Sequence, residues 1–240
     1  MKFSLFVLVL AVLLFPLVSC NLSSEQRISV FSFSFDFSTA DQGWTGDFAD
    51  YPDGDSIGYE LLFKHDTLPT NLNQNKTKKA LLISGNNGSD DLFMFVKRKL
   101  SGLRPNATYE LLFNVQLASD APTNAVGAGG APGESVYLKV GATIEEPKKE
   151  LDVDNMLRMN IDKGNQAEDG EDMIVIGHIG VAPTTTQYAS ITRNNNSTSS
   201  FIATTDSNGE LWLIVGTDSG FEGTTTLYYM KIDVLFNQLD

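Results

Sequence analysis

The stretch VFSFSFDFS, residues 30–38, alternates strictly between an apolar position and a polar one from Phe31 to Ser38. Successive side chains of a β-strand point to opposite faces, so the four phenylalanines would share one face of a strand. An amphipathic helix would instead repeat its apolar residues every three or four positions. This stretch therefore predicts a half-buried strand and indicates a fold built from strands.

Strand-like stretches continue along the whole chain and are bounded by Gly, Pro, Asn or Asp. We predict further strands at residues 57–63, 80–84, 92–100, 108–118, 134–143, 157–161, 173–179, 200–205, 210–217 and 225–236. After residue 20 the sequence shows no sustained helical period. It therefore predicts an all-β sandwich of about eleven strands, forming a single domain over residues 30–240.

The first twenty residues, MKFSLFVLVLAVLLFPLVSC, combine an early lysine with a short apolar run. The run suits the core of a signal peptide and is shorter than the roughly 20 residues that a membrane-spanning helix needs. The sequence LVSC at residues 17–20 resembles the bacterial lipobox, which implies cleavage before Cys20 and acylation of its thiol. We expect a signal peptide at 1–19, a lipidated polar tether at 20–29, and an exported protein anchored to the cell membrane or outer membrane.

The alternative is a secreted glycoprotein with an ordinary signal peptide. It is favoured by the Asn-X-Ser/Thr sequences at Asn21, Asn75, Asn87, Asn106, Asn195 and Asn196. In either case Cys20 is the only cysteine, so the domain has no disulfide to stabilise it.

The charge of the chain excludes some partners. It has 17 basic and 30 acidic residues and a net charge of −13, which becomes −14 without the single lysine of residues 1–19. Nucleic acids and anionic lipid headgroups both attract basic surfaces. We therefore expect no nucleic-acid partner, and a membrane contact made through the lipid anchor.

Four segments, in chain order, resemble the jelly-roll carbohydrate-binding modules of the galactose-binding-like superfamily. They are FDFSTADQGWTG (35–46), KALLISG (79–85), LSGLRPNATYELLFNVQLAS (100–119), and SFIATTDSNGELWLIVGT with TTTLYYMKIDVLF (200–236). The resemblance covers about half of the chain and also extends to bacterial lipoproteins with similar segments. It implies a jelly-roll β-sandwich that binds a glycan without catalysis.

Three polar loops are candidates for the ligand site, at residues 43–56, 84–91 and 217–224, and could line one end of the sandwich. Sugar sites combine an aromatic ring, which covers the apolar face of the sugar, with carboxylates and amides that bond its hydroxyls. The predicted ligand residues are Trp44, Asp47, Asp50, Tyr51, Asn86, Asn87, Asp90, Asp218 and Glu222. The alternative is that Trp44 fills the core and the aspartates form turns.

The segment DKGNQAEDGED, residues 162–172, concentrates oxygen-bearing side chains. Calcium takes six to eight oxygen ligands of this kind. We predict a structural Ca²⁺ held by Asp162, Asn165, Asp169 and Asp172, against the alternative of a solvated acidic loop.

The sequence offers little for catalysis. His65 and His178 lack metal-ligand spacing, and no Gly-X-Ser-X-Gly motif is present. We expect a non-enzyme. Two alternatives stay open: an envelope scaffold that binds another protein, and a glycoside hydrolase that uses a pair of carboxylates.

Overall fold

The computed structural model describes residues 29–196 and 199–239, so the predicted signal peptide and Cys20 lie outside the described residues. The described residues form strands and no helix, and none of them forms a segment that could cross a bilayer as a helix. The strands are β1 (Val30–Asp36), β2 (Thr45–Ala49), β3 (Tyr51–Pro52), β4 (Leu62–Thr67), β5 (Lys79–Asn86), β6 (Phe93–Leu100), β7 (Thr108–Ser119), β8 (Val136–Thr143), β9 (Lys149–Leu151), β10 (Met156–Met159), β11 (Met173–His178), β12 (Ala189–Asn194), β13 (Phe201–Thr204), β14 (Leu211–Ser219) and β15 (Thr224–Gln238).

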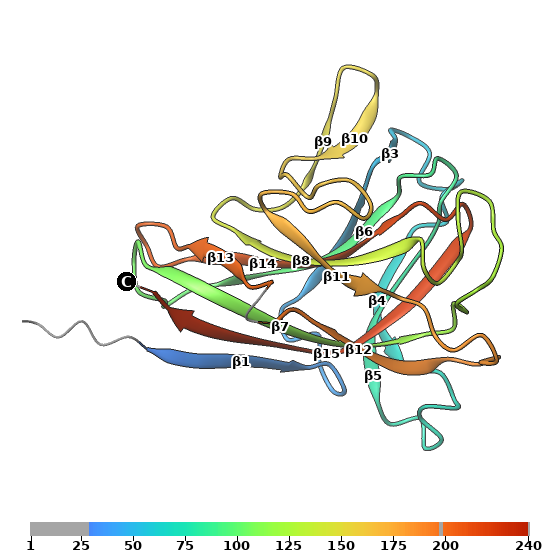
Figure 1. Cartoon of the computed structure of the whole chain (residues 1–240), viewed down its shortest axis with the longest axis horizontal. Coiled ribbons are helices and arrows are strands. Elements are labelled where there is room, and N and C mark those ends of the chain that lie inside the picture. The colour runs from blue at the N-terminus through green and yellow to red at the C-terminus, as the bar shows by residue number, and fades with distance from the viewer. Residues whose placement is uncertain (1–28, 197–198, 240) are drawn as a thin grey trace, which may run out of the picture.

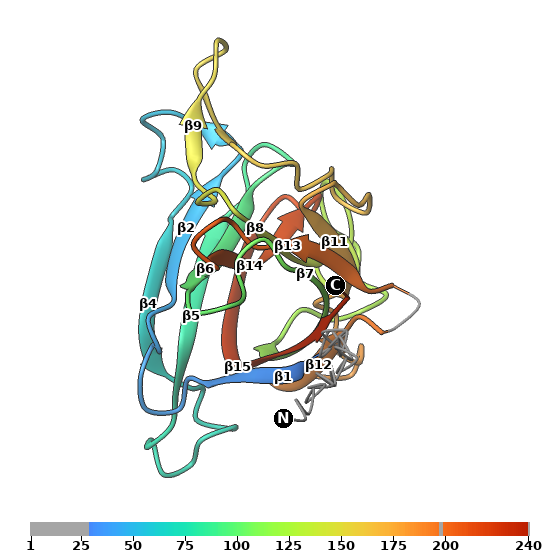
Figure 2. The same cartoon turned by 90° about the vertical axis from the view of Figure 1, so that its left-hand side faces the viewer.

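Two antiparallel sheets face each other, which confirms the predicted β-sandwich. The seven-stranded sheet has the order β12-β7-β15-β5-β4, with β1 paired to β15 and β13 paired to β7. The five-stranded sheet has the order β11-β8-β14-β6-β2. A small third sheet, β3-β10-β9, projects from one side of the sandwich (Figure 1). Figure 2 shows β1 and β15 on the opposite side of the sandwich from β8 and β14.

The core lies between the two sheets and follows the alternation in the sequence. On β7, the five apolar residues at alternate positions are at most 1% exposed: Tyr109, Leu111, Phe113, Val115 and Leu117. In the opening stretch, Phe35 and Phe37 are buried. Phe31 is half-buried and stacks on Phe236 of β15, with ring centroids 5.3 Å apart. The phenylalanine alternation therefore does mark the buried face of a strand, as predicted.

The largest hydrophobic cluster draws its residues from Phe31 near the start of the described chain to Phe236 near its end. Residues from both ends of the described chain thus pack into one core. We therefore expect a protein that begins at Ser23, without the leader and Cys20, to fold, and we use it in the experiments below.

The predicted strands agree with the structure except at residues 57–63. Residues 53–60 form turns in which Ile57 is 89% exposed, and β4 begins only at Leu62. Strands β2, β3, β9 and β12 were not predicted. Each is short, and β12 (ASITRN) has a single large apolar residue, so alternation is barely visible in its sequence.

Candidate ligand-binding surfaces

The two aromatic residues predicted to hold a ligand belong to the core. Trp44 is 2% exposed and packs edge to face against Phe35 and Phe37, with ring centroids 5.4 and 6.1 Å away. Tyr51 is 3% exposed and packs against Tyr59. Because neither ring presents a face to solvent, the prediction that they stack on a sugar is wrong, and Trp44 is the core residue that the alternative described.

The three candidate loops do meet at one place, and the predicted calcium loop joins them. The Asn87 amide donates to the carbonyls of Ser219 and Phe221, at 2.8 and 3.0 Å, and so ties loop 84–91 to loop 217–224. Gln166 donates its backbone N–H to Asp218 and its side-chain amide to the carbonyl of Asp90. This arrangement makes Asn87 a buried structural residue, so it is unavailable to a ligand.

Where the loops meet, four charged side chains form a buried ion-pair cluster: Asp50, Lys139, Lys163 and Asp218. The Lys163 ammonium lies 2.7 Å from the Asp218 carboxylate and 3.1 Å from that of Asp50. The Lys139 ammonium lies 3.3 Å from Asp218. The two strands that carry Lys139 and Asp218, β8 and β14, are neighbours, and their register puts both residues on the outer face of the five-stranded sheet.

Burial and charge compete within this cluster. Burial lowers the pKa of Lys139, although the Asp218 carboxylate opposes the change. Burial also raises the pKa of Asp50, against the effect of Lys163. For Lys163, burial acts to lower the pKa, but the carboxylates of Asp218 and Asp50 outweigh it and raise the pKa. Asp50 and Asp218 are 3% and 0% exposed, so the prediction that they bind a ligand at the surface is wrong.

Arg158 of β10 closes the outer side of the cluster. Its guanidinium lies 3.4 Å from Asp50 and 3.6 Å from Asp152, and it also donates a hydrogen bond to Asp91 at 2.5 Å. The small third sheet is thereby tied by charge to the end of the sandwich where the loops meet.

Loop 162–172 uses its carboxylates to hold its own backbone. Asp162 accepts from the N–H groups of Gly164 and Glu171, and these hydrogen bonds lower its pKa. Asp172 accepts from the Asp162 N–H at 2.8 Å, and Asp169 from the Val175 N–H at 2.6 Å. The Asn165 carbonyl accepts from the Glu168 N–H.

A cation already lies against this loop, since the Lys139 ammonium donates to the carbonyls of Lys163 and Glu168, at 2.7 and 2.9 Å. Within residues 29–196 and 199–239, no three Asp, Glu, His or Cys side chains are grouped as a metal site. The backbone bonds and the lysine explain the shape of the loop without an ion, and calcium binding stays a prediction.

The remaining predicted ligand residues lie nearer the surface. Asp47 pairs with Lys149 at 2.7 Å, and Asn86 accepts a long hydrogen bond from Thr224. Asp90 and Glu222 are exposed. These four are accessible polar groups, but the aromatic rings predicted to accompany them are buried.

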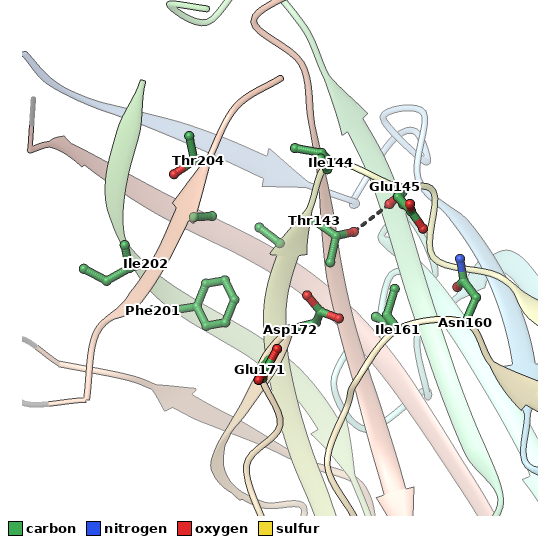
Figure 3. A pocket seen from close by; sticks show the side chains of 12 residues that line it. Thr143, Ile144, Glu145, Asn160, Ile161, Glu171, Asp172, Phe201, Ile202 and Thr204 are labelled. Atoms are coloured by element: carbon green, nitrogen blue, oxygen red, sulfur yellow. Dashed lines mark hydrogen bonds between the residues drawn. The ribbon is translucent and has the colours of Figure 1, made fainter. Parts of the chain in front are cut away.

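A groove of about 380 Å³ lies between the end of β8 and β13 (Figure 3). Three of its side chains are carboxylates, those of Glu145, Glu171 and Asp172. Ile144 and Ile202 flank the groove and are 59% and 54% exposed. Strand β13 pairs only with β7, so among the described strands none covers its other edge. The one ring in the groove, Phe201, is buried.

A second surface, on the outer face of the seven-stranded sheet, was missed by sequence reasoning. Tyr228 of β15 and Tyr188, just before β12, meet edge to face with ring centroids 5.2 Å apart. Both are half-buried and pack over Ala118, the residue of β7 that the register places opposite Tyr228. The neighbouring Tyr229 points the other way and is buried in the core.

Tyr188, Thr226, Tyr228 and Met230 form a row that we call the tyrosine face. It lies between two hollows. One, of about 200 Å³, is lined by Asp120 and residues 224–226, and the other, of about 230 Å³, by Gln116, Met230 and Lys231. Burial, with help from the Asp120 carboxylate, raises the pKa of Tyr188 to about 12. The phenol therefore stays protonated at neutral pH and can donate a hydrogen bond.

Both histidines have structural partners. His65 Nε2 lies 2.7 Å from the carbonyl of Phe37, and His178 Nδ1 accepts from the Gly180 N–H at 3.0 Å. These contacts stabilise the local backbone, and among the described residues neither ring forms an ion pair with a carboxylate.

No family model and no curated protein matches this chain. Solved structures that match include the carbohydrate-binding module TmCBM27, studied for mannan recognition, at 10% identity and a TM-score of 0.38, over 87% of this chain and 98% of that one. TmCBM61 in complex with β-1,4-galactotriose matches at 7% identity and a TM-score of 0.35, over 79% and 86%. The enzymatically active domain of bacteriophage CBA120 tailspike protein 4 matches at 8% identity and a TM-score of 0.34, over 82% of this chain but only 19% of that one. All three TM-scores are below 0.5, so these matches carry no argument about the fold, the ligand or the activity of this chain.

Proposed function

We propose that this protein is a non-catalytic, membrane-anchored lipoprotein whose β-sandwich binds a glycan on the tyrosine face. The observation that carries the proposal is the Tyr188–Tyr228 pair, two partly exposed rings set between two polar hollows. Aromatic rings of this kind cover the apolar face of a sugar, while nearby polar groups bond its hydroxyls.

The polar groups along the tyrosine face suit a neutral, hydroxyl-rich ligand. Asp120 and Thr226 line one hollow, and Gln116 lines the other, so carboxylate, hydroxyl and amide are all present. Strands rise about 3.3 Å per residue, so the row from Thr226 to Met230 extends roughly 13 Å. An oligosaccharide would lie along β15 more readily than a single sugar would.

The test is a glycan-array screen of the protein that begins at Ser23, followed by titration of each glycan retained. Replacing Tyr228 or Tyr188 by alanine is expected to weaken binding about thirtyfold or more, the effect of removing an interface residue worth about 2 kcal/mol. Trp212→Ala is the matched control, since Trp212 is a half-buried ring on the other sheet. Binding that survives both tyrosine changes would contradict the proposal.

The same screen, run with and without calcium, tests the predicted metal. If Ca²⁺ supports the fold near loop 162–172, chelation should lower both the melting temperature and glycan retention. If neither changes, the loop needs no ion.

A specific observation favours a protein partner as the second candidate function. The groove beside β13 combines an open strand edge with two exposed isoleucines, Ile144 and Ile202. Open edges and exposed apolar residues are common at protein interfaces. A blank glycan array from a folded sample, with an envelope protein that copurifies with the wild type and not with Ile202→Lys, would establish this reading.

The anchor is tested separately. We expect Cys20→Ser, made in the full chain and expressed in a bacterium, to release the protein from the membrane fraction, because attachment would depend on acyl chains worth about 0.8 kcal/mol per buried methylene. Fractionation and metabolic labelling with a fatty acid check this, with Ser19→Ala as a control that leaves the thiol in place. A membrane-bound, unlabelled wild type would contradict it.

A further inference from the structure

The buried ion-pair cluster places an amine directly against a carboxyl group, with a second carboxyl group beside it. We propose that Lys163 and Asp218 react with each other in the folded protein and become joined by an amide bond between their side chains. The bond would link loop 162–172 to β14, two segments 55 residues apart. It would be a covalent cross-link in a domain that has no disulfide.

The geometry satisfies the first requirement of such a reaction, which is close and persistent approach. The Lys163 Nζ lies 2.7 Å from Asp218 Oδ2, and the two side chains are 9% and 0% exposed. Holding two reactants in this way is equivalent to very high local concentrations, about 10⁵ M or more in well-oriented cases. The Phe93 ring lies under the Lys163 ammonium, with its centroid 5.2 Å from Nζ, and helps to exclude water from this side.

The second requirement is a group that transfers protons, and Asp50 lies close enough to Lys163 to do this. Its Oδ2 lies 3.1 Å from Lys163 Nζ. It is 3% exposed, and burial raises its pKa, which favours a carboxyl group that can take up and return a proton. Asp50 is therefore assigned as the proton relay. Lys163 must lose a proton before its nitrogen can attack, and Asp50 is the nearest group besides Asp218 that can accept one.

The reaction is a condensation in which the atoms balance. The neutral Lys163 amine attacks the carboxyl carbon of Asp218, and a bond forms between Nζ and Cγ. Asp50 passes protons from the nitrogen to the carboxyl oxygen Oδ1, the Cγ–Oδ1 bond breaks, and one water molecule leaves. No oxidant, reductant or cofactor is required.

The surroundings of Asp218 stabilise the charge that develops during this step. Its Oδ2 accepts from the Gln166 N–H at 2.9 Å and lies 3.3 Å from the Lys139 ammonium. Fixed donors at such an oxygen stabilise a tetrahedral intermediate. Its Oδ1 is buried and, among the described residues, has no hydrogen-bond partner. This oxygen can therefore leave as water without breaking a hydrogen bond to the protein.

Charge stays balanced after the reaction. The cluster begins with two carboxylates and two ammonium groups, and the condensation removes one of each. Asp50 and Lys139 remain as one buried anion and one buried cation. Lys139 is less well placed to attack, because its Nζ lies 3.3 Å from Asp218 and donates to the carbonyls of Lys163 and Glu168.

The protein contains its own control. Lys97 is 10% exposed and lies 2.8 Å from Glu146, a similar approach of amine and carboxylate. Glu146 is 52% exposed, however, and no second carboxylate is paired with Lys97 among the described residues. This pair is therefore in contact with water and lacks a second carboxylate that could transfer protons. We therefore expect one cross-link in the molecule, not two.

The test is the intact mass of the protein that begins at Ser23, measured in denaturing acid, where an ion pair separates and an amide persists. We expect a mass lower than that of the sequence by one water molecule. A tryptic digest should contain a branched peptide that joins Lys163 to Asp218. The full sequence mass would overturn the proposal and leave an ion pair. So would a water loss that maps elsewhere, for example to the Asp169-Gly170 sequence, where an aspartate can cyclise.

Two variants separate the reaction from the fold. Lys163→Arg keeps the positive charge but cannot form the amide, and Asp50→Asn keeps the shape of the relay but cannot carry the proton. Both are expected to show the full sequence mass, with circular dichroism confirming that they fold. A water loss that persists at Lys163 and Asp218 in Asp50→Asn would overturn the role of Asp50. The wild-type mass decides the main proposal even if a variant fails to fold.

Discussion

Replacing Asp218 by alanine is expected to lower the free energy of unfolding by about 3–5 kcal/mol, the usual effect of breaking a buried ion pair from one side. Asp218 is fully buried and lies against two ammonium groups, those of Lys139 and Lys163. Without it, Lys139 would be a fully buried cation with no paired carboxylate within 4.0 Å among the described residues. The free energy of unfolding should also fall if Asp218 is cross-linked to Lys163, because the alanine variant loses that cross-link as well.

Urea unfolding of the protein that begins at Ser23 checks this prediction. The midpoint of Asp218→Ala should fall in either case. The slope of the transition should stay unchanged if Asp218 forms only an ion pair, and should rise if a cross-link is lost, because the unfolded chain then exposes more surface. Glu150→Ala is the matched control, because Glu150 pairs with Lys148 at 2.9 Å with both side chains more than half exposed. Exposed pairs contribute little, so its midpoint should not move. An equal response of the two variants would mean that the buried cluster contributes no more than a surface pair.

Most strands could be predicted because the alternation of apolar and polar residues in their sequences matches the alternation of buried and exposed positions. On β7, buried residues alternate with more exposed ones from Thr108 to Leu117, so the pattern gives both the strand and the face that enters the core. Strand β2 (TGDFA) has no such alternation, and it forms because β6 offers it a paired edge. The turn at residues 53–60 misled the prediction in the opposite way, because it shows alternation without forming a strand. Ile57, Tyr59 and Leu61 alternate as in a strand, yet Ile57 points into solvent.

The candidate sites were harder to predict because they depend on which distant residues meet. The three candidate loops were expected to converge, and they do. The sequence could not tell that Lys139 and Lys163 would meet the carboxylates there and turn an expected ligand site into a buried cluster. One local signal was available, since Lys139 interrupts the apolar strand VYLKVGAT. Charged residues are seldom buried without a partner, so this lysine predicts a buried carboxylate.

The tyrosine face shows the same limit of local patterns. Tyr228 lies on the outward side of β15, which alternation predicts once Tyr229 is placed in the core. Tyr188 comes from a segment without a strand pattern, and it reaches Tyr228 only because β12 and β15 both pair with β7. The contact between the two tyrosines therefore depends on the order of strands in the sheet, which cannot be inferred from any single stretch of sequence.

Replacing Trp44 by alanine is expected to cost about 3–5 kcal/mol of stability, as for other buried aromatic residues cut back to alanine. Its ring is held between Phe35 and Phe37, which are themselves buried, so the neighbouring chain cannot easily collapse into the space. Trp44→Phe should cost less, because it keeps an aromatic ring and removes an indole N–H that is buried without a hydrogen-bond partner in the described structure.

Thermal and urea unfolding of Trp44→Ala, Trp44→Phe and Trp212→Ala would measure these costs, with the half-buried Trp212 as the control. The same samples decide between the core and the ligand site. If Trp44 is a core residue, any glycan binding found for the wild type should persist in Trp44→Ala at temperatures where the variant is still folded. If instead Trp44→Ala keeps its stability and loses glycan binding, then the ring belongs to the ligand site, and the tyrosine face is not where the sugar binds.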